Sequence, residues 1–219
     1  FIINNNRNVA NADGFDIAGT SNISINHCFV STADDGICIK NAVWLGNTGM
    51  MSNISVTDCE VISRANSFKI GTETTYDISN VTVRNCKFMM TDLYPGTVSG
   101  IAIESADGSR VHNITVQNII MDRVTCPVFI RLCNRNRAAE VDAVSANVVE
   151  FGKKKKKASS APKDMFDKKG EVFNINISDI TATNAEIPVI VAGYRQHGST
   201  RYVSDVTLKN FEIYYAPYK

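Results

Sequence analysis

The chain has 219 residues, enough for one or two domains, and its charged side chains almost balance at a formal net charge of +1. This balance gives no reason to expect a nucleic-acid partner. No apolar run is long enough to span a membrane, so we expect no membrane partner, and the sequence carries no signal peptide.

One short pattern recurs along the chain. It first occurs as Ser21-Asn-Ile-Ser-Ile-Asn-His-Cys28, and it returns in copies that start at Ser52, Ser79, His112, Phe173 and Ser204. The steps between successive starts are 31, 27, 33, 61 and 31 residues. A fixed period in this range is typical of a solenoid, in which each repeat packs on the next.

Each copy reads as a β-strand with one buried face. Ile23 and Ile25 alternate with polar residues, which is the period of a strand. A second strand follows, for example Gly36-Ile-Cys-Ile-Lys40, and no period has room for a long helix. We therefore predict an all-β fold, a right-handed parallel β-helix that forms one domain over residues 1–219.

The repeat has one long interruption and no clear beginning. Residues 135–170 break the pattern and contain the lysine run 153–157, so we expect a solvated, mobile insertion there. The chain opens at Phe1 already inside the coil pattern, which leads us to expect earlier coils that this sequence does not contain. The missing signal peptide therefore says nothing about the compartment.

The repeat register predicts columns of side chains on the second strand of each coil, because successive side chains point to opposite faces. One inward column is Phe15, Ile37, Phe68, Ile101, Val128 and Val189, and the next is Ile17, Ile39, Ile70, Ile103, Ile130 and Val191. The outward columns are Asp16, Cys38, Lys69, Ala102 and Phe129, then Ala18, Lys40, Gly71, Glu104 and Arg131. The outward face is either a solvated surface or a binding surface.

Two further columns run through the first strands. Cys28, Cys59 and Cys86 share a position that is apolar in later copies, which favours buried free thiols over a disulfide or a metal site. An asparagine recurs in Asn-x-Ser/Thr triplets, which could accept glycans in a secreted protein. A turn-forming Asn that bonds backbone groups in every coil explains the regular position better.

A polar column lies directly before the second strands. In order, it is Asp13, Asp35, Asn66, Ser99, Cys126 and Ile187. Asp13 and Asp35 occupy equivalent places in adjacent coils, so their backbones should lie about 5 Å apart, and Asp34 beside Asp35 completes a cluster of three carboxylates. Such crowding raises one pKa and leaves other groups ionised, which supplies an acid and a base for hydrolysis of a glycosidic bond. Asp-Gly turns and a calcium site are the alternatives.

These residues resemble a known family. Asn11-Ala-Asp-Gly14 and then Asp34-Asp-Gly-Ile-Cys-Ile39 are similar to the Asn-Thr-Asp-Gly and Asp-Asp motifs of family 28 glycoside hydrolases, the polygalacturonase family. The resemblance covers essentially the whole chain. It implies an inverting hydrolase on a right-handed β-helix, with Asp34 as the general acid and with Asp13 and Asp35 activating water.

The chain departs from the family pattern at three positions. Asn66 stands where the family has His, and Ala102 and Glu104 stand where it has the two cations of Arg-Ile-Lys. Lys69 and Arg131 lie one coil away on either side, so we hypothesise that they contact the substrate, with Glu104 between them. A surface ladder of Lys, Glu and Arg without a ligand is the alternative.

The family resemblance, with these patterns, implies an extracellular or periplasmic hydrolase that cleaves a pectic polysaccharide of galacturonan or rhamnogalacturonan type. The expected catalytic residues are Asp13, Asp34 and Asp35, and the expected substrate-binding residues are Asn66, Lys69, Glu104 and Arg131. We expect a monomer without cofactor or metal. Two alternatives stay open: a β-helical lyase using calcium, with Lys69 or Arg131 as the base, and a non-catalytic carbohydrate-binding β-helix.

Overall fold

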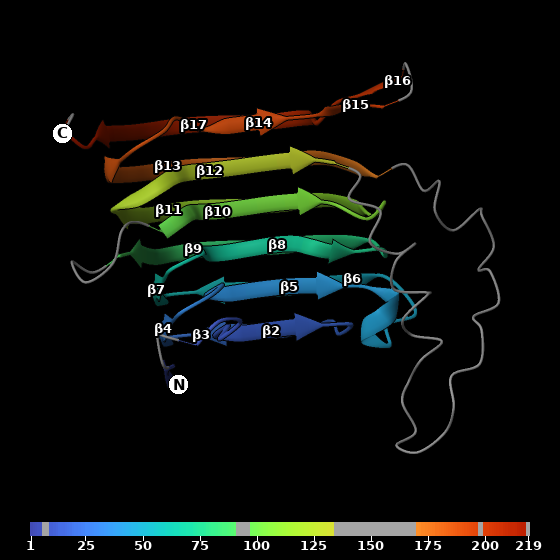
Figure 1. Ribbon diagram of the computed structural model, residues 1–219, viewed down its shortest axis with the longest axis horizontal. Coiled ribbons are helices and arrows are strands. Elements are labelled where there is room, and N and C mark those ends of the chain that lie inside the picture. Colours follow the sequence, from blue (N-terminus) through green and yellow to red (C-terminus); the bar gives the residue numbers. More distant parts are fainter. Residues whose placement is uncertain (6–8, 91–96, 134–169, 197–198, 218–219) are drawn as a thin grey trace.

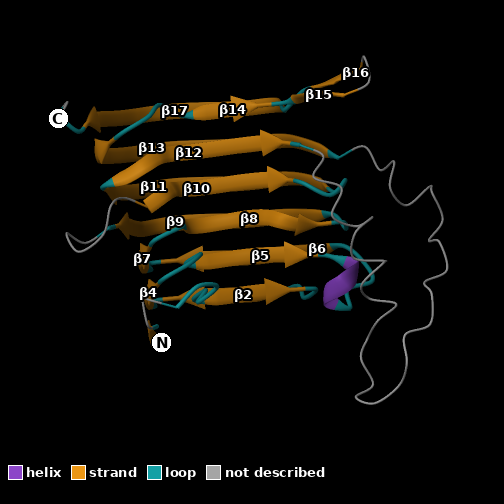
Figure 2. Ribbon diagram, in the orientation of Figure 1, coloured by secondary structure: helices purple, strands orange, loops and turns teal. Residues whose placement is uncertain are grey.

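The computed structural model shows a stack of parallel β-coils (Figures 1 and 2). It describes residues 1–5, 9–90, 97–133, 170–196 and 199–217. Apart from Gly170, the predicted insertion at 135–170 and its lysine run lie outside the described residues. In the described parts of the chain, no helix has the length and apolar character needed to cross a membrane.

Two parallel sheets run the length of the stack, which confirms the predicted parallel β-helix. The first sheet contains β1 (Ile2–Asn4), β3 (Ile23–Asn26), β4 (Phe29–Thr32), β6 (Met51–Thr57), β7 (Glu60–Ser63), β9 (Ile78–Met89), β11 (Arg110–Asp122), β13 (Glu171–Ala185) and β17 (Ser204–Tyr215). Each recurring pattern of the sequence falls on one of these strands. Strands one coil apart pair in parallel, for example Ile23 opposite Ile54.

The second sheet carries the second strand of each coil. It contains β2 (Phe15–Ala18), β5 (Ile37–Asn41), β8 (Asn66–Thr74), β10 (Thr97–Ser105), β12 (Val124–Leu132) and β14 (Ile190–Ala192). The short 3₁₀ helix η1 (Val43–Leu45) follows β5, and β15 (Tyr194–Gln196) pairs antiparallel with β16 (Ser199–Arg201). Figure 1 shows β2, β5, β8, β10, β12 and β14 stacked in chain order.

The core lies between the two sheets, and the predicted inward columns form the part of it contributed by the second sheet. Ile37, Phe68 and Ile101 stand opposite one another on adjacent strands and are completely buried. Burial of Val, Ile and Phe side chains stabilises the stack because each removes apolar surface from water. Val191 is the exception: it is 44% exposed, since it lies on β14, the last strand of its sheet.

The asparagine column forms a side-chain ladder, which corrects the predicted bonding to the backbone. Asn22, Asn53, Asn80, Asn113 and Asn174 all have left-handed backbone, with φ between 53° and 61°. Asn tolerates this conformation better than most residues. The amide nitrogen of each residue after Asn22 donates to the amide oxygen of the residue one step earlier in the column, at 2.7 to 3.4 Å. The ladder therefore ties successive turns together on the outer side of the first sheet.

The cysteine column consists of buried free thiols, as predicted. Cys28, Cys59 and Cys86 are at most 5% exposed, and none forms a disulfide. Each thiol donates a hydrogen bond to the carbonyl two residues earlier, at 3.1 to 3.3 Å. These thiols therefore pack as small apolar groups that also satisfy turn carbonyls.

Gly36 occupies a position with no room for a side chain. A Cβ there would lie 2.3 Å from Cγ1 of Val61 and 2.6 Å from the backbone oxygen of Ser67. We expect Gly36→Ala to lower the free energy of unfolding by about 1–3 kcal/mol through overpacking, as measured by urea denaturation. Gly49→Ala is the matched control, because a Cβ there meets nothing within 4 Å. Equal stability of the two variants would contradict this packing.

Candidate active site

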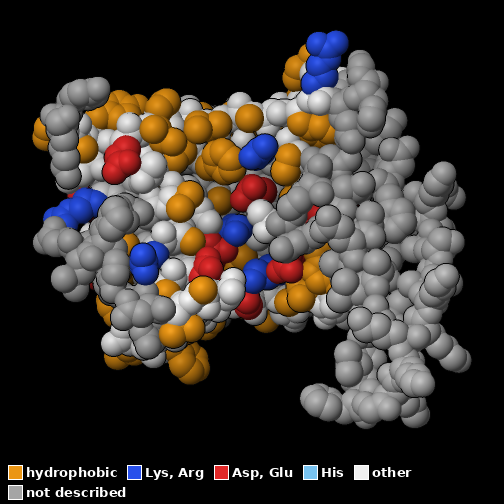
Figure 3. All heavy atoms as spheres, in the orientation of Figure 1, with side chains coloured by type: hydrophobic (Ala, Val, Ile, Leu, Met, Phe, Trp, Pro, Cys, Tyr) orange, Lys and Arg blue, Asp and Glu red, His pale blue; other side chains and the backbone are white. Residues whose placement is uncertain are grey.

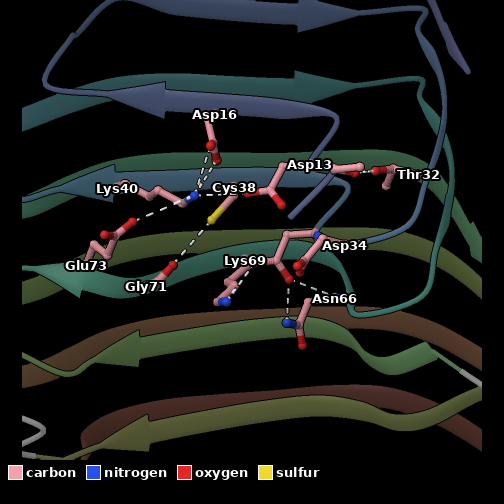
Figure 4. Close-up of polar contacts among 12 residues, drawn as sticks. Asp13, Asp16, Thr32, Asp34, Cys38, Lys40, Asn66, Lys69, Gly71 and Glu73 are labelled. Carbon is pink, nitrogen blue, oxygen red and sulfur yellow. Dashed lines mark hydrogen bonds and ion pairs between the residues drawn. The ribbon is translucent and has the colours of Figure 1, made fainter. Parts of the chain in front are cut away.

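Charged side chains gather in the middle of the second sheet (Figure 3). The register places Asp13 before β2, Asp35 before β5 and Asn66 at the start of β8. Gly14 N donates to Asp35 O at 2.9 Å, and Gly36 N donates to Asn66 O at 2.7 Å. The predicted polar column is therefore built by the backbone pairing of three successive coils. Asp13 and Asp34 lie near each other in Figure 4, and the charges of both Asp35 and Asp13 act on Asp34.

Asp35 is the most enclosed of the three carboxylates. Its side chain is 5% exposed, and both of its oxygens are occupied. Oδ1 accepts from the Asn66 side-chain amide at 2.6 Å and from Asn66 N at 3.2 Å, while Oδ2 pairs with Lys69 Nζ at 2.7 Å. Ser99 Oγ donates to Asn66 Oδ1 at 2.5 Å, which orients the amide nitrogen toward Asp35. Two predicted substrate-binding residues, Asn66 and Lys69, thus contact a predicted catalytic residue.

Asp13 has a different cation, Lys40, which the sequence reasoning missed as a site residue. Lys40 Nζ lies 2.9 Å from Asp13 Oδ2, 2.8 Å from Asp16 Oδ1 and 3.7 Å from Glu73 Oε2. Trp44 Nε1 donates to Glu73 Oε1 at 2.9 Å. Burial by itself lowers the pKa of Lys40, but its hydrogen bonds to Asp16 and Asp13 leave that pKa above its ordinary value. Lys40 is therefore a fixed cation beside Asp13.

The contact with Glu73 depends on an irregularity in the sheet. We predicted Gly71 opposite Lys40 in a regular column, but the register between β5 and β8 shifts after Ile39, so that Asn41 pairs with Thr74. Extra residues on one strand of a pair re-aim its side chains. This correction explains how Glu73 comes within reach of Lys40, which a strictly regular register does not indicate.

Cys38 forms part of the floor of this site. It belongs to an outward column, yet it is completely buried, and it lies among the charged side chains in Figure 4. Its thiol donates to Gly71 O at 3.3 Å. Burial, with the Asp35 charge adding to it, raises the pKa of the Cys38 thiol well above its ordinary value, so this group is a packed thiol rather than a thiolate.

Asp34 has the electrostatic surroundings of a proton donor. Burial raises its pKa above the ordinary value, and the nearby charges of Asp35 and Asp13 raise it further. Its Oδ1 accepts a hydrogen bond from Asp35 N at 3.0 Å. Among the residues that the structure describes, no Lys or Arg forms an ion pair with Asp34, in contrast to Asp13 and Asp35. The three aspartates therefore differ in charge environment: Asp34 has a raised pKa, whereas Asp13 and Asp35 each face a lysine. Such a difference can give carboxyl groups of one site different roles.

The two remaining predicted substrate-binding residues lie farther along the same face. Glu104 on β10 stands opposite Arg131 on β12, and Lys69 stands opposite Ala102. Burial by itself lowers the pKa of Lys69. The nearby Asp35 carboxylate and, less strongly, Glu104 raise it, and the pKa ends above its ordinary value. Arg131 is exposed. Lys69 is thus directed to Asp35, whereas the Arg131 guanidinium lies on the open surface.

The acidic groups have no arrangement typical of a metal site. No group of three or more His, Cys, Asp or Glu residues in the described ranges has a geometry that could hold a metal ion. Lys40 and Lys69 already place ammonium groups against Asp13 and Asp35. A divalent cation at these carboxylates would meet two positive charges within contact distance, which opposes its binding.

Parallel coils with an acid cluster in register on one sheet define a β-helical protein with a candidate acid/base site. The family described as Glycosyl hydrolases family 28 matches residues 1–163, so the chain belongs to this family. This finding confirms the family resemblance of the aspartate motifs.

Individual relatives named as polygalacturonases match a shorter part of the chain than the family model does. The chain is 33% identical over 127 residues to a protein of Arabidopsis thaliana named "Probable polygalacturonase", which covers 55% of this chain and 24% of that protein. It is 33% identical over 122 residues to an endo-polygalacturonase of Pectobacterium carotovorum subsp. carotovorum, covering 55% of this chain and 28% of that protein. An endo-polygalacturonase of Pectobacterium parmentieri is 30% identical over 122 residues, again with 55% and 28% covered. The matches span about a quarter of the length of these relatives.

Proposed function

We propose that this protein hydrolyses glycosidic bonds of a pectic polysaccharide, of galacturonan or rhamnogalacturonan type, with inversion at the anomeric carbon. The observation that carries the proposal is the cluster of three aspartates, in which one carboxyl has a raised pKa and the other two face lysines. Family membership and relatives named polygalacturonase support the pectic substrate. The site of action we propose is extracellular or periplasmic, and the protein acts as a monomer without a cofactor.

The chemistry assigned to the cluster is direct displacement by water. Asp34, whose raised pKa favours the protonated form, gives its proton to the glycosidic oxygen as the bond to the anomeric carbon breaks. Water attacks that carbon from the opposite face, and its proton passes to the Asp13–Asp35 side of the cluster. Inverting enzymes separate acid and base carboxyl groups by roughly 6.5–9.5 Å to admit this water.

The proposed substrate contacts are Asn66, Lys69, Glu104 and Arg131. Arg131 is the exposed cation of this set, and a guanidinium binds a sugar carboxylate well because it can donate two parallel hydrogen bonds. We expect Arg131→Ala to raise KM on the pectic substrate about tenfold while kcat changes little. Arg84→Ala, an exposed arginine on β9 of the other sheet, is the control and should leave KM unchanged. Equal KM values for both variants would exclude Arg131 as a substrate contact.

The products test the proposal against both alternatives. Purified protein is incubated with homogalacturonan and with rhamnogalacturonan, while reducing ends and ultraviolet absorbance are followed. Hydrolysis predicts new reducing ends without an absorbing double bond, whereas a lyase produces unsaturated sugars. Binding without any cleavage would indicate a carbohydrate-binding β-helix. The lyase mechanism is disfavoured because the raised pKa of Lys69 makes this side chain a poor base.

A further inference from the structure

Lys40 is surrounded by more negative charge than one ammonium group balances. Figure 4 shows this ammonium among three carboxylates, and it lies 2.9 Å from Asp13, 2.8 Å from Asp16 and 3.7 Å from Glu73. The Asp16 side chain is 46% exposed, whereas that of Lys40 is 16% exposed. This part of the site therefore presents mainly carboxylate oxygens to a ligand.

Lys69 lies in a similar setting one coil further on. Its ammonium is 2.7 Å from the Asp35 carboxylate, and its side chain is 13% exposed. Glu104, on the adjacent strand β10, is a second negative charge that acts on it. Five carboxylates, without Asp34, thus stand around two ammonium groups in the described part of this site. The exposed Arg131 opposite Glu104 adds one positive charge and leaves the negative charge in excess.

This excess of negative charge opposes the binding of a negatively charged sugar unit at the cluster. A galacturonate carboxylate placed there would meet like charges at short range, while Lys40 and Lys69 already contact protein carboxylates. Like charges repel strongly in a partly desolvated site, and such repulsion is a common way to exclude the wrong ligand. An uncharged sugar avoids this repulsion, and its hydroxyl groups can donate hydrogen bonds to ionised carboxylates, which are acceptors only.

We propose that the sugar unit bound at this cluster carries no charge, so that the protein discriminates against fully de-esterified homogalacturonan, in which every unit carries a carboxylate. This inference rests on the proposed pectic hydrolysis and narrows its substrate. Rhamnogalacturonan fits the site best: its rhamnose is the uncharged unit, and Arg131, two strands beyond Lys69, can bind the carboxylate of another unit of the same chain. Methyl-esterified homogalacturonan is the other source of an uncharged unit.

Initial rates on the three polymers test this selectivity. The wild-type kcat/KM should be at least about tenfold lower on de-esterified homogalacturonan than on rhamnogalacturonan, because of like-charge repulsion. Salt screens such repulsion, so a higher ionic strength should bring the two values closer. Equal values, or a ratio that salt does not change, would overturn the proposal. An esterified polymer cleaved as fast as rhamnogalacturonan would support it and show that the site selects for the absence of charge, not for rhamnose.

Glu73→Gln removes one of the negative charges without disturbing its neighbours. The new amide oxygen can still accept from Trp44, and Lys40 keeps its two closer carboxylates. This variant should reduce the ratio between the two kcat/KM values about threefold or more. Glu212→Gln, an exposed position on β17 of the other sheet, is the matched control and should keep the wild-type ratio. The same ratio in both variants would contradict the proposal.

Trp44 provides a measurement that does not depend on turnover. It is the single tryptophan of the chain and donates to Glu73 Oε1 at 2.9 Å, so its fluorescence should change when a sugar binds beside it. Rhamnogalacturonan oligomers should bind the Asp34→Asn protein at least about tenfold more tightly than galacturonate oligomers of equal length. Equal affinities, or no fluorescence change with either, would refute the proposal. If the wild type cleaves no polymer but this preference is found, the proposed hydrolysis is wrong and the charge preference stands.

Discussion

Asp34→Asn is expected to lower kcat on a pectic substrate by about 10²- to 10⁴-fold while KM changes little, because the amide cannot protonate the departing oxygen. In the wild-type protein, kcat/KM should fall as the pH rises through the raised pKa of Asp34, since only the protonated carboxyl acts as an acid. Asp34→Asn should lose this basic limb along with the activity. The measurement is a series of initial rates across the pH range.

The control for this substitution is Asp58→Asn. Asp58 is an exposed residue between β6 and β7 whose Oδ1 accepts from the Asn85 amide at 3.2 Å. Asn occupies the same position in other coils, so the same chemical change there should leave both rate and stability close to the wild type. An Asp34→Asn protein that turns over substrate as fast as Asp58→Asn would exclude Asp34 as the acid.

Lys69→Met is expected to lower the free energy of unfolding by about 3–5 kcal/mol, because it leaves the buried Asp35 carboxylate without its counter-charge. Asp35 is 3% exposed, and its ion pair with Lys69 measures 2.7 Å. Adding Asp35→Asn should recover most of the lost stability, because the double variant no longer buries an unpaired charge. Urea denaturation of the wild type and both variants gives these differences.

An exposed lysine supplies the comparison for this stability effect. Lys87 lies on β9 with its side chain in solvent, so Lys87→Met should change the free energy of unfolding by no more than about 0.5 kcal/mol. If Lys69→Met were as stable as Lys87→Met, the Lys69–Asp35 pair would contribute nothing to the folded state.

The repeat period was sufficient to predict the architecture and the meeting of the three aspartates. In-register stacking follows directly from alternating apolar residues that recur at a fixed step, as the burial of Ile37, Phe68 and Ile101 shows. The same register placed Asp13 and Asp35 in one column, and the backbone bond from Gly14 N to Asp35 O reflects that pairing.

The predictions were incomplete where the chain departs from a regular coil. The register shift after Ile39 brings Glu73 to Lys40, and a column drawn with constant offsets cannot show it. The contact between Lys69 and Asp35 was also unforeseen: the column predicted an outward-facing lysine, and the structure adds an ion pair between its ammonium and the Asp35 carboxylate. Long side chains choose among several nearby partners, so their strand position alone does not fix their contacts.

The most direct test of the account is the configuration of the first product. Wild-type protein is mixed with a defined galacturonan or rhamnogalacturonan oligomer, and ¹H NMR follows the anomeric signals before mutarotation. Inverting hydrolysis at the aspartate cluster predicts that the new reducing end appears first with the anomeric configuration opposite to that of the cleaved bond. Retained configuration, an unsaturated product, or no cleavage of any pectic oligomer would contradict the mechanism.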